Sequence, residues 1–330
     1  MENKRYYSFS LYRLIASILI LQFHIFFVCY PNDITDTIYL SKFLLGLTAL
    51  SGFIYSQKII TSVKAFYLER LKRIIIPAFI ALIIMTIWNV LFMIIKHQPD
   101  FISTYVGYRA FNNGLLIEPG NFYYIPFILV CYLLTPLLKM NKKWLSILIT
   151  ILVIAIETLF IIKVEPTYIV TSYLIGYFVG KYFFCRYVNK YEVKDFIHLF
   201  IWAIIFVSFF LISYYLLNGL IVIHNKFHYI LRGFSLMMFG VSTLFIYLLA
   251  SKFINKINKN PVFDFTDKVS YPLYLLNQTF MCGAMNVTTY VSKLWSKTIL
   301  VYLFTISFAI LVYYLSKVVI TKINTIHANK

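Results

Sequence analysis

Long apolar runs alternate with short polar segments along the whole chain. Most of the runs approach the length of about 20 residues that an α-helix needs to cross a bilayer. The pattern predicts about ten membrane-spanning helices, at residues 11–29, 39–55, 74–95, 122–138, 144–163, 167–184, 197–217, 229–250, 270–287 and 298–317. The longest polar gap, from Lys96 to Asn121, is too short for a second domain. We therefore expect an all-α, polytopic membrane helix bundle, with one domain over 1–330 and no fused extracytoplasmic domain.

Composition supports a membrane protein and indicates its orientation. The chain of 330 residues is 61% hydrophobic and only 13% charged, whereas about a quarter of the residues are charged in soluble proteins. Its net charge is +18, and the basic residues lie mainly in short loops that alternate with loops poor in cations. This is the positive-inside pattern of membrane topology rather than a nucleic-acid footprint. We expect a multi-pass protein of the cell membrane with both termini cytoplasmic and no nucleic-acid partner.

The cysteines and the N-terminus indicate neither a metal site nor a signal peptide. The cysteines lie in or beside apolar runs without the spacing of metal ligands; they are Cys29, Cys131, Cys185 and Cys282. We expect them to be packing residues, and we expect no metal site. Lys4 and Arg5 precede a long apolar run that no small-residue cleavage site follows, so we expect that run to be a retained helix.

The first apolar run holds the most informative pair of residues. Arg13 lies near its start and His24 lies deep within it. Titratable groups inside a bilayer are costly, so they are candidates for function. Eleven residues of helix bring the two side chains to within about 20° of the same direction, separated by about 16 Å along the axis. The alternative is an arginine at the membrane rim and a histidine that is satisfied by a neighbouring helix.

A basic segment precedes the third apolar run. It reads KAFYLERLKRIIIP from Lys64 to Pro77, and on a helix Arg70 and Arg73 share one face. A guanidinium pair at the inner membrane edge suits a polyanionic cytoplasmic ligand, because arginine binds phosphate through two parallel hydrogen bonds. Anchoring on anionic lipid explains the same charges and is favoured on spacing alone. We expect Pro77 to start or kink the helix.

Other residues give weaker signals. Glu157 lies within the fifth predicted span, where it either orients His24 or binds an acceptor, or else pairs with a lysine or snorkels. Arg232, near the start of the eighth span, is a weak candidate for substrate binding. Glycine features indicate packing instead. Gly52 permits a tight turn or a close helix contact, and GYFVG from Gly176 to Gly180 has the spacing of a helix-packing motif.

Four sequence elements carry a resemblance to a known family. They are RLIASILILQFH from Arg13 to His24, LSGFIYS after the second run, ERLKRIIIP with Arg70 and Arg73, and VSYPLYLL from Val269 to Leu276. With these elements spread over nearly its whole length, the chain resembles the acyltransferase 3 family of integral membrane acyltransferases, which O-acylate bacterial surface glycans. The first and third elements match the family's R-x10-H and R-x-x-R motifs, and the fourth is similar to its late SYxLYLxH element.

Two positions depart from the family pattern. The late element of the family usually ends in histidine, but this chain has Asn277 there. Asparagine donates and accepts hydrogen bonds but cannot shuttle a proton at neutral pH, so an acid or base role is absent at this position. Asn277 stays a weak candidate for substrate binding. Tyr123 and Tyr124 lie where the family often has a Trp-Phe-Leu cluster.

The resemblance implies an enzyme that moves an acyl group, most often acetyl, from acyl-CoA to a hydroxyl of a surface or lipid-linked carbohydrate such as O-antigen or capsule. It implies that Arg70 and Arg73 hold the phosphates of acyl-CoA at the inner face, while Arg13 guides CoA or offsets charge. His24 is then the general base on the acceptor hydroxyl, or it accepts the acyl group itself. The expected place is the bacterial inner membrane. Acyl-CoA is a donor substrate, and no permanently bound cofactor is expected.

Two other classes of function stay open. A transporter or flippase would move a polysaccharide or an acyl group across the inner membrane without chemistry of its own. A sensor or structural membrane protein would tolerate the loss of both His24 and Arg70. Release of free CoA that depends on His24 separates the enzyme from both alternatives.

Overall fold

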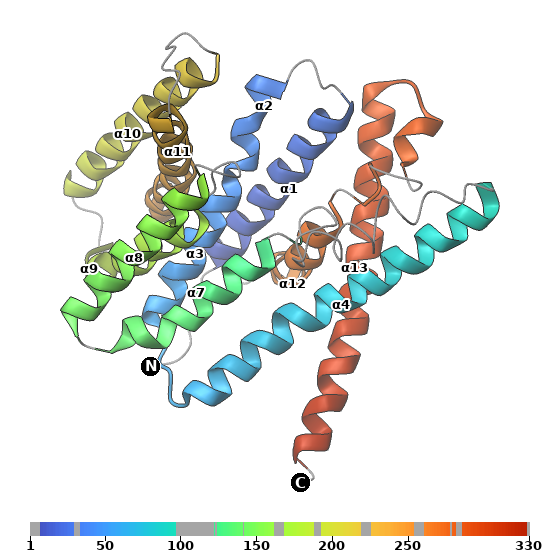
Figure 1. Ribbon diagram of the computed structural model, residues 1–330, viewed down its shortest axis with the longest axis horizontal. Helices are drawn as coiled ribbons and strands as arrows, with labels where there is room; N and C mark the ends of the chain where they lie inside the picture. Colours follow the sequence, from blue (N-terminus) through green and yellow to red (C-terminus); the bar gives the residue numbers. More distant parts are fainter. Residues whose placement is uncertain are drawn as a thin grey trace. The chain divides into compact units, whose positions relative to one another are not determined.

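A computed structural model shows a chain built of helices (Figure 1). It describes residues 7–29, 34–96, 122, 124–140, 142–161, 168–187, 193–218, 226–253, 261–277, 279–281 and 286–328, and the part so described contains no β-strand. The elements are α1 (Tyr7–Cys29), α2 (Ile34–Ser41), α3 (Phe43–Gln57), α4 (Val63–Lys96), α7 (Tyr124–Lys139), α8 (Lys143–Ile161), α9 (Ile169–Tyr187), α10 (Val193–Leu217), α11 (Lys226–Phe253), α12 (Pro261–Leu276), the short 3-10 helix η4 (Val287–Tyr290) and α13 (Leu294–Ala328).

The predicted all-α class is confirmed for the described residues, whereas the number of about ten spans stays a prediction. Each predicted span overlaps a helix. Four helical segments are long and apolar enough to cross a membrane, namely Phe9–Cys29, Ile38–Gln57, Phe227–Leu248 and Leu294–Ile326. Two further apolar helices, Tyr124–Lys139 and Phe200–Leu216, are shorter. The helices therefore suit a membrane protein, which was the expectation from composition.

The ninth predicted span, 270–287, is wrong in its extent. The helix α12 ends at Leu276, and in the turn that follows the amide of Thr279 donates to the carbonyl of Leu276 at 3.1 Å. The apolar run continues beyond the helix because Phe280 and Met281 are buried by packing. Hydrophobicity reports burial, and over a short run it does not tell a helix from another buried segment.

The helix α4 begins earlier than the sequence predicted. It starts at Val63 and continues through Pro77, so the proline does not start the helix, and the other expectation, a kink at Pro77, stays a prediction. Proline has no amide hydrogen and cannot donate to the carbonyl of Arg73, four residues earlier. Arg70 and Arg73 therefore lie on a continuous helix, in the turns that lead up to the proline.

The chain forms two compact units, each made of separated segments. The first unit comprises Met1–Ile20, Thr35–Val63 and Phe127–Phe263. The second comprises Leu21–Ile34, Lys64–Pro126 and Asp264–Lys330. The division falls within α1, which contributes its first half to the first unit and its second half to the second unit.

In the first unit, α3 packs closely against α9. The backbones approach each other at glycines: a Cβ atom at Gly52 would overlap the carbonyl oxygen of Tyr173, and one at Gly176 would overlap that of Ala49. Helices come this close only where a residue has no side chain in the contact. The expected close contact at Gly52 and the packing role of the Gly176 to Gly180 motif are therefore confirmed.

Aromatic rings and buried hydroxyl groups complete the first unit, in which α11 packs against both α10 and α3. The Tyr39 ring lies 4.8 Å from the Phe210 ring and 5.2 Å from the Phe239 ring, measured between centroids. The Tyr12 hydroxyl lies 2.8 Å from the Thr243 hydroxyl, so each polar group has a partner inside the apolar core. Buried polar groups without such partners are costly.

The core of the second unit lies where α4, α12 and α13 contribute buried side chains. Small residues of α4, such as Ala78 and Ala81, belong to the same apolar cluster as Leu276 and Phe280. The Phe280 ring packs on α13, with its centroid 5.7 Å from that of Phe304 and 5.0 Å from that of Phe308. The turn after α12 is thus held against α13 by an aromatic side chain.

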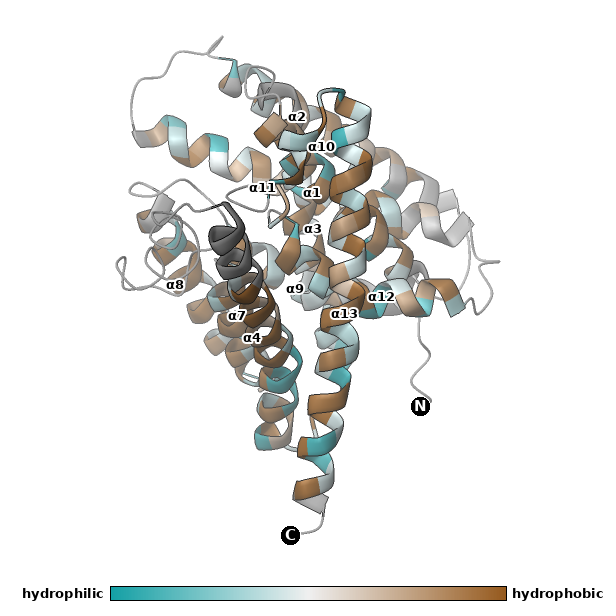
Figure 2. Cartoon of the chain, turned by 90° about the vertical axis from the view of Figure 1, so that its right-hand side faces the viewer, coloured by the Kyte–Doolittle hydropathy of each residue, from teal (hydrophilic) through white to brown (hydrophobic). Residues whose placement is uncertain are grey.

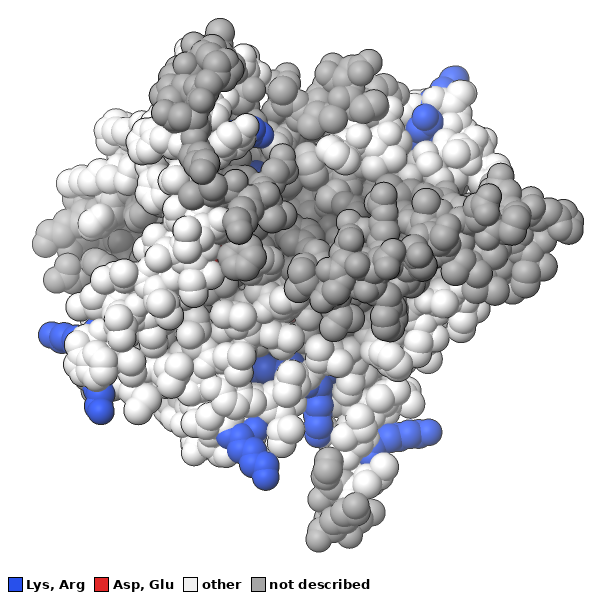
Figure 3. Space-filling model, viewed as in Figure 1, with Lys and Arg blue, Asp and Glu red and all other residues white. Residues whose placement is uncertain are grey.

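Large apolar side chains are exposed on the outward faces of helices in both units. Ile151, Leu159, Phe200 and Ile299 are each more than half exposed. Figure 2 shows apolar residues dominating α13, with polar residues interspersed toward its C-terminal end. The described part of the face drawn in Figure 3 is mostly uncharged, with separate lysine and arginine groups. Such surfaces are unfavourable in water but match lipid chains, so the outward faces suit a bilayer.

The close approach of α3 and α9 predicts a strong effect of added side-chain volume. We expect Gly176→Val to lower the thermal midpoint of the purified protein markedly or to prevent folding, because the new methyl groups overlap the backbone at Ala49. The matched control is Ala155→Val, since Ala155 lies exposed on α8. Thermal unfolding in detergent measures both. Equal midpoints for the two variants would contradict the close packing.

Candidate active site

His24 is buried on the second half of α1, with an exposed fraction of 9%. Its helical neighbours Leu21 and Ile25 are fully buried in a cluster with Met281 and Val301. This cluster joins the second half of α1 to α13 and to the turn after α12. The histidine thus comes from a helix that is anchored in the apolar interior of the second unit, where a titratable group is rare.

Arg13 lies on the same helix as His24. Helix α1 is continuous from Arg13 to His24. Eleven residues of α-helix return to nearly the same direction, so the two residues lie on one face of α1, as expected. Arg13 itself is partly exposed and belongs to the first unit, whereas His24 belongs to the second. Their alignment is therefore a property of α1 alone.

Arg70 and Arg73 share an acidic partner on α4. One carboxylate oxygen of Glu69 accepts from Arg70 at 2.9 Å and from Arg73 at 2.8 Å. The two arginines differ in access: the Arg70 side chain is 8% exposed, whereas that of Arg73 is 63% exposed. The Arg70 guanidinium also lies over the Phe66 ring at 5.7 Å. Arg70 is thus fixed in position, and Arg73 presents its guanidinium outward.

A hydrogen bond joins α12 to α4 beside the arginines. The Tyr271 hydroxyl donates to the carbonyl of Ile74 at 3.2 Å, one residue after Arg73. Tyr271 belongs to the late sequence element, and Asn277 follows it by six residues, a rise of about 9 Å on a helix. Helix α12 therefore contacts α4 next to the R-x-x-R motif, and Asn277 directly follows the C-terminal end of α12.

Asn277 is almost fully buried, with an exposed fraction of 1%. Among the residues that the structure describes, neither of its side-chain polar atoms has a hydrogen-bond partner. A buried amide group without partners is unfavourable unless a ligand or water supplies them. The residue that replaces the family's late histidine is therefore placed in an apolar core with its hydrogen-bonding capacity unused.

Glu157 has a structural role that the sequence did not indicate. Its two carboxylate oxygens accept from the amide of Val170 at 2.8 Å and from the amide and hydroxyl of Thr171 at 2.9 and 2.6 Å. These amides belong to the first turn of α9, where no helical partner exists. The carboxylate also faces the positive end of the helix dipole. Capping of α9 accounts for the burial of Glu157, and a role in substrate binding stays a prediction.

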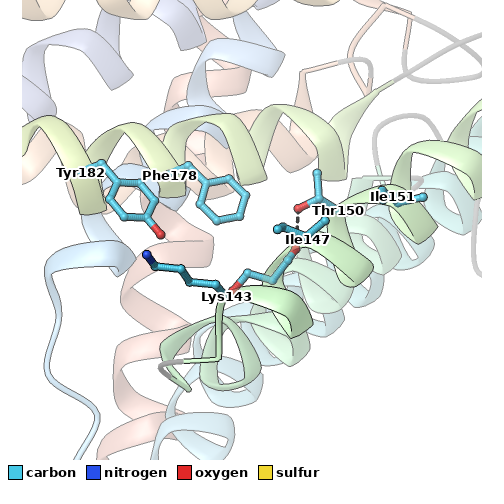
Figure 4. Close-up of a pocket in the computed structure, with 7 residues that line it drawn as sticks. Lys143, Ile147, Thr150, Ile151, Phe178 and Tyr182 are labelled. Atoms are coloured by element: carbon cyan, nitrogen blue, oxygen red, sulfur yellow. Dashed lines mark hydrogen bonds between the residues drawn. The ribbon is translucent and has the colours of Figure 1, made fainter.

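Arg232 lies partly exposed on α11 in the first unit, and its predicted substrate role stays a prediction. The same unit carries a groove of about 340 Å³ between α8 and α9, and none of the predicted site residues lines it. Its lining is mostly apolar, with Ile147, Ile151 and Phe178, and in Figure 4 the amine of Lys143 points toward the hydroxyl end of Tyr182. Such a lining offers lipid contact rather than catalytic groups.

The two units divide the predicted site residues between them. The second unit holds His24, Arg70, Arg73 and Asn277, whereas Arg13, Glu157 and Arg232 belong to the first. The described residues contain no group of histidine, cysteine, aspartate or glutamate that could hold a metal ion. The residues that match the family's motifs are thus brought into one unit, apart from Arg13 and the Gly52 element.

Glu69 is the acidic partner of both arginines, and it was not among the residues predicted from the sequence. The signal was available, because Glu69 precedes Arg73 by four residues and a helix brings such pairs together. No sequence signal points to Thr279 or Thr305, which are buried near Asn277 and Phe304, because hydroxyl residues occur throughout apolar helices.

The described helices carry apolar outward faces, and one compact unit holds a buried histidine and two arginines, which suits an integral membrane protein. The chain belongs to the acyltransferase 3 family: the family's acyltransferase domain matches residues 6–315, which is nearly the whole chain. It is therefore a membrane protein of an acyltransferase family. No curated protein and no solved structure shows a significant match to it.

The capping of α9 by Glu157 predicts a loss of stability on substitution. We expect Glu157→Ala to lower the free energy of unfolding by about 2 kcal/mol, because buried amides at the helix start lose their acceptor. Glu157→Gln keeps an acceptor oxygen and is expected to lose less. Thermal unfolding of the purified variants measures both effects. An Ala variant as stable as the parent chain would contradict the capping role.

Proposed function

We propose that this protein is a membrane O-acyltransferase of the bacterial inner membrane, which moves an acyl group such as acetyl from cytoplasmic acyl-CoA to a hydroxyl of a surface or lipid-linked polysaccharide. The observation that carries the proposal is that the buried His24 belongs to the same compact unit as Arg70 and Arg73, in a chain of an acyltransferase family. Acyl transfer needs a base or nucleophile and a bound donor, and these residues offer both.

His24 supports two routes for the transfer. In the direct route, its neutral imidazole takes the proton of the acceptor hydroxyl while the hydroxyl oxygen attacks the thioester carbonyl. The carbon–sulfur bond breaks, and the sulfur leaves as the thiol of CoA with the proton from the imidazolium. In the two-step route, one ring nitrogen of His24 attacks the thioester carbonyl, the carbon–sulfur bond breaks, and CoA leaves as a thiol with the proton from the other ring nitrogen. The acceptor hydroxyl then attacks the acyl-imidazole, the carbon–nitrogen bond breaks, and the hydroxyl proton returns to the ring, so that His24 regains its starting state.

The arginines have complementary properties for holding the donor. Arg73 presents an exposed guanidinium that can form two parallel hydrogen bonds with a phosphate. Arg70 is buried and supplies a fixed positive charge beside it. Glu69 orients both side chains, and a bound polyphosphate competes with it for their hydrogens. Arg13, on α1, adds a cation that guides CoA or offsets charge during transfer.

The first test of this proposal concerns His24. We expect His24→Ala to abolish acylation of the polysaccharide and release of free CoA, while the protein still inserts in the membrane, because the base or nucleophile is lost. His198→Ala is the matched control, since His198 lies exposed on α10. The assay offers acetyl-CoA to purified protein and follows CoA release and product mass. Full turnover by the His24 variant would sink the assignment, and glycan translocation without CoA turnover would favour a transporter.

The second test concerns the donor. We expect Arg73→Ala to raise the KM for acyl-CoA about tenfold, because a charge-assisted pair of hydrogen bonds to phosphate is lost. Arg73→Lys should recover only part of the affinity, since lysine keeps the positive charge but lacks the planar guanidinium group that forms two parallel hydrogen bonds. Lys64→Ala, which removes an exposed cation at the start of α4, is the control. Initial rates over a range of acyl-CoA concentrations give the KM. Equal effects of the Arg73 and Lys64 variants would mean a general effect of surface charge.

A further inference from the structure

Three buried polar side chains of the second unit have no hydrogen-bond partner among the described residues. They are Asn277, Thr279 and Thr305, with exposed fractions of 1%, 2% and 0%. Each polar group gave up its hydrogen bonds to water when the chain folded, and nothing in the described part of the protein replaces them. Isolated cases occur in proteins, but three in one unit point to a missing partner.

Thr305 differs from the other hydroxyl residues of the helices. Inside a helix, a threonine or serine hydroxyl commonly donates to the carbonyl four residues earlier. This bond is made by Thr48, Thr86, Thr135, Thr150, Ser316, Thr321 and Thr325. The Thr305 hydroxyl makes no such bond, although it is completely buried. Its hydroxyl group therefore has hydrogen-bonding capacity that the described residues do not use.

The three side chains belong to one junction, between α13 and the turn that follows α12. Asn277 and Thr279 lie within this turn, and Phe280 packs against Phe304 and Phe308 on either side of Thr305 in the sequence of α13. The next residue of the turn, Met281, packs with Val301, one helical turn before Thr305. Residues 301, 304, 305 and 308 share one face of a helix, so Thr305 faces the turn.

The chemistry of this junction selects a neutral ligand. The polar side chains that the junction itself contributes are an amide and two hydroxyls, set among the apolar side chains of two clusters. A phosphate or carboxylate would lose its hydration there without a compensating charge. The asparagine amide offers one acceptor and two donor hydrogens, and each threonine offers a donor and an acceptor. A secondary amide needs one donor and one acceptor, so the asparagine side chain is its natural partner.

The position of the junction also fits a long ligand that has one end bound at the arginines. Tyr271 ties α12 to α4 one residue after Arg73, and Asn277 lies about 9 Å further along the helix direction. A CoA molecule with its phosphates at Arg73 extends a flexible arm that carries secondary amides. The separation is within the reach of this arm, and the amides meet groups of matching polarity.

We propose that Asn277, Thr279 and Thr305 form a hydrogen-bonding site for the amide groups of the pantetheine arm of the acyl-CoA donor. This inference rests on the proposed function and adds a specific site to it. The asparagine that replaces the family's late histidine is then a donor-binding residue. It aligns the thioester through the arm and takes no part in proton transfer.

The test compares two ligands on the full-length purified protein. CoA carries the arm, whereas 3′-phosphoadenosine 5′-diphosphate is its nucleotide part alone. We expect Asn277→Leu and Thr305→Val each to weaken CoA binding about three- to tenfold, the effect of one or two neutral hydrogen bonds, and to leave binding of the nucleotide unchanged. Thr279→Val is a further variant in case one of these does not fold.

Three controls make the result specific. Ser316→Ala removes a buried hydroxyl of α13 that is already bonded to the carbonyl of Val312, and it should leave CoA binding as in the parent protein. Arg73→Ala should weaken both ligands. Asn277→Leu should keep or raise the thermal midpoint, because it removes a buried polar group that has no partner in the folded chain. A structural asparagine would instead lose stability.

Each outcome decides the proposal. Unchanged CoA affinity in the variants, or an equal loss for both ligands, would overturn it. A higher KM for the polysaccharide with normal CoA binding would assign the junction to the acceptor and also overturn it. If the parent protein binds neither CoA nor the nucleotide, the donor assignment of the proposed function fails, and the pantetheine site fails with it.

Discussion

The structure depends on one constraint: every polar group that enters the apolar interior needs a hydrogen-bond partner. Helices satisfy their own backbone, which is why the described residues of so apolar a chain are helical. Side chains follow the same rule. The Tyr12 and Thr243 hydroxyls pair with each other, and Glu157 accepts from the start of α9. Asn277, Thr279 and Thr305 are exceptions, and they lie beside the elements that carry the family's motifs.

The two units meet this constraint in different ways. In the first, glycines bring α3 and α9 into backbone contact, and a carboxylate caps the helix that they position. In the second, small residues and aromatic rings fill the space between α4, α12 and α13. The second unit also holds His24, Arg70 and Arg73. Among the described residues, the first unit also has a buried hydroxyl without a partner, that of Tyr177, whereas the second unit has Asn277, Thr279 and Thr305.

Features that lie within one helix could be predicted from the sequence. The common face of Arg13 and His24 and the proximity of Arg70 to Arg73 follow from helical spacing, and the helices exist as expected. Prediction was weaker where an apolar run ends. The run after Leu276 stays hydrophobic because Phe280 and Met281 are buried, but the backbone there turns. Periodicity predicts burial, and only the packing partners show whether a buried segment is helical.

The sequence by itself determined the helical class, the membrane character and the family, because apolar length and local motifs are written along the chain. Tertiary structure alone decided which polar residues are satisfied. Only the structure shows that Glu157 accepts hydrogen bonds from the start of α9, while its role in substrate binding stays a prediction. Only the structure shows that Asn277 is buried without a partner among the described residues. Hydrogen-bond partners of buried groups come from residues distant in sequence, so no local pattern reports them.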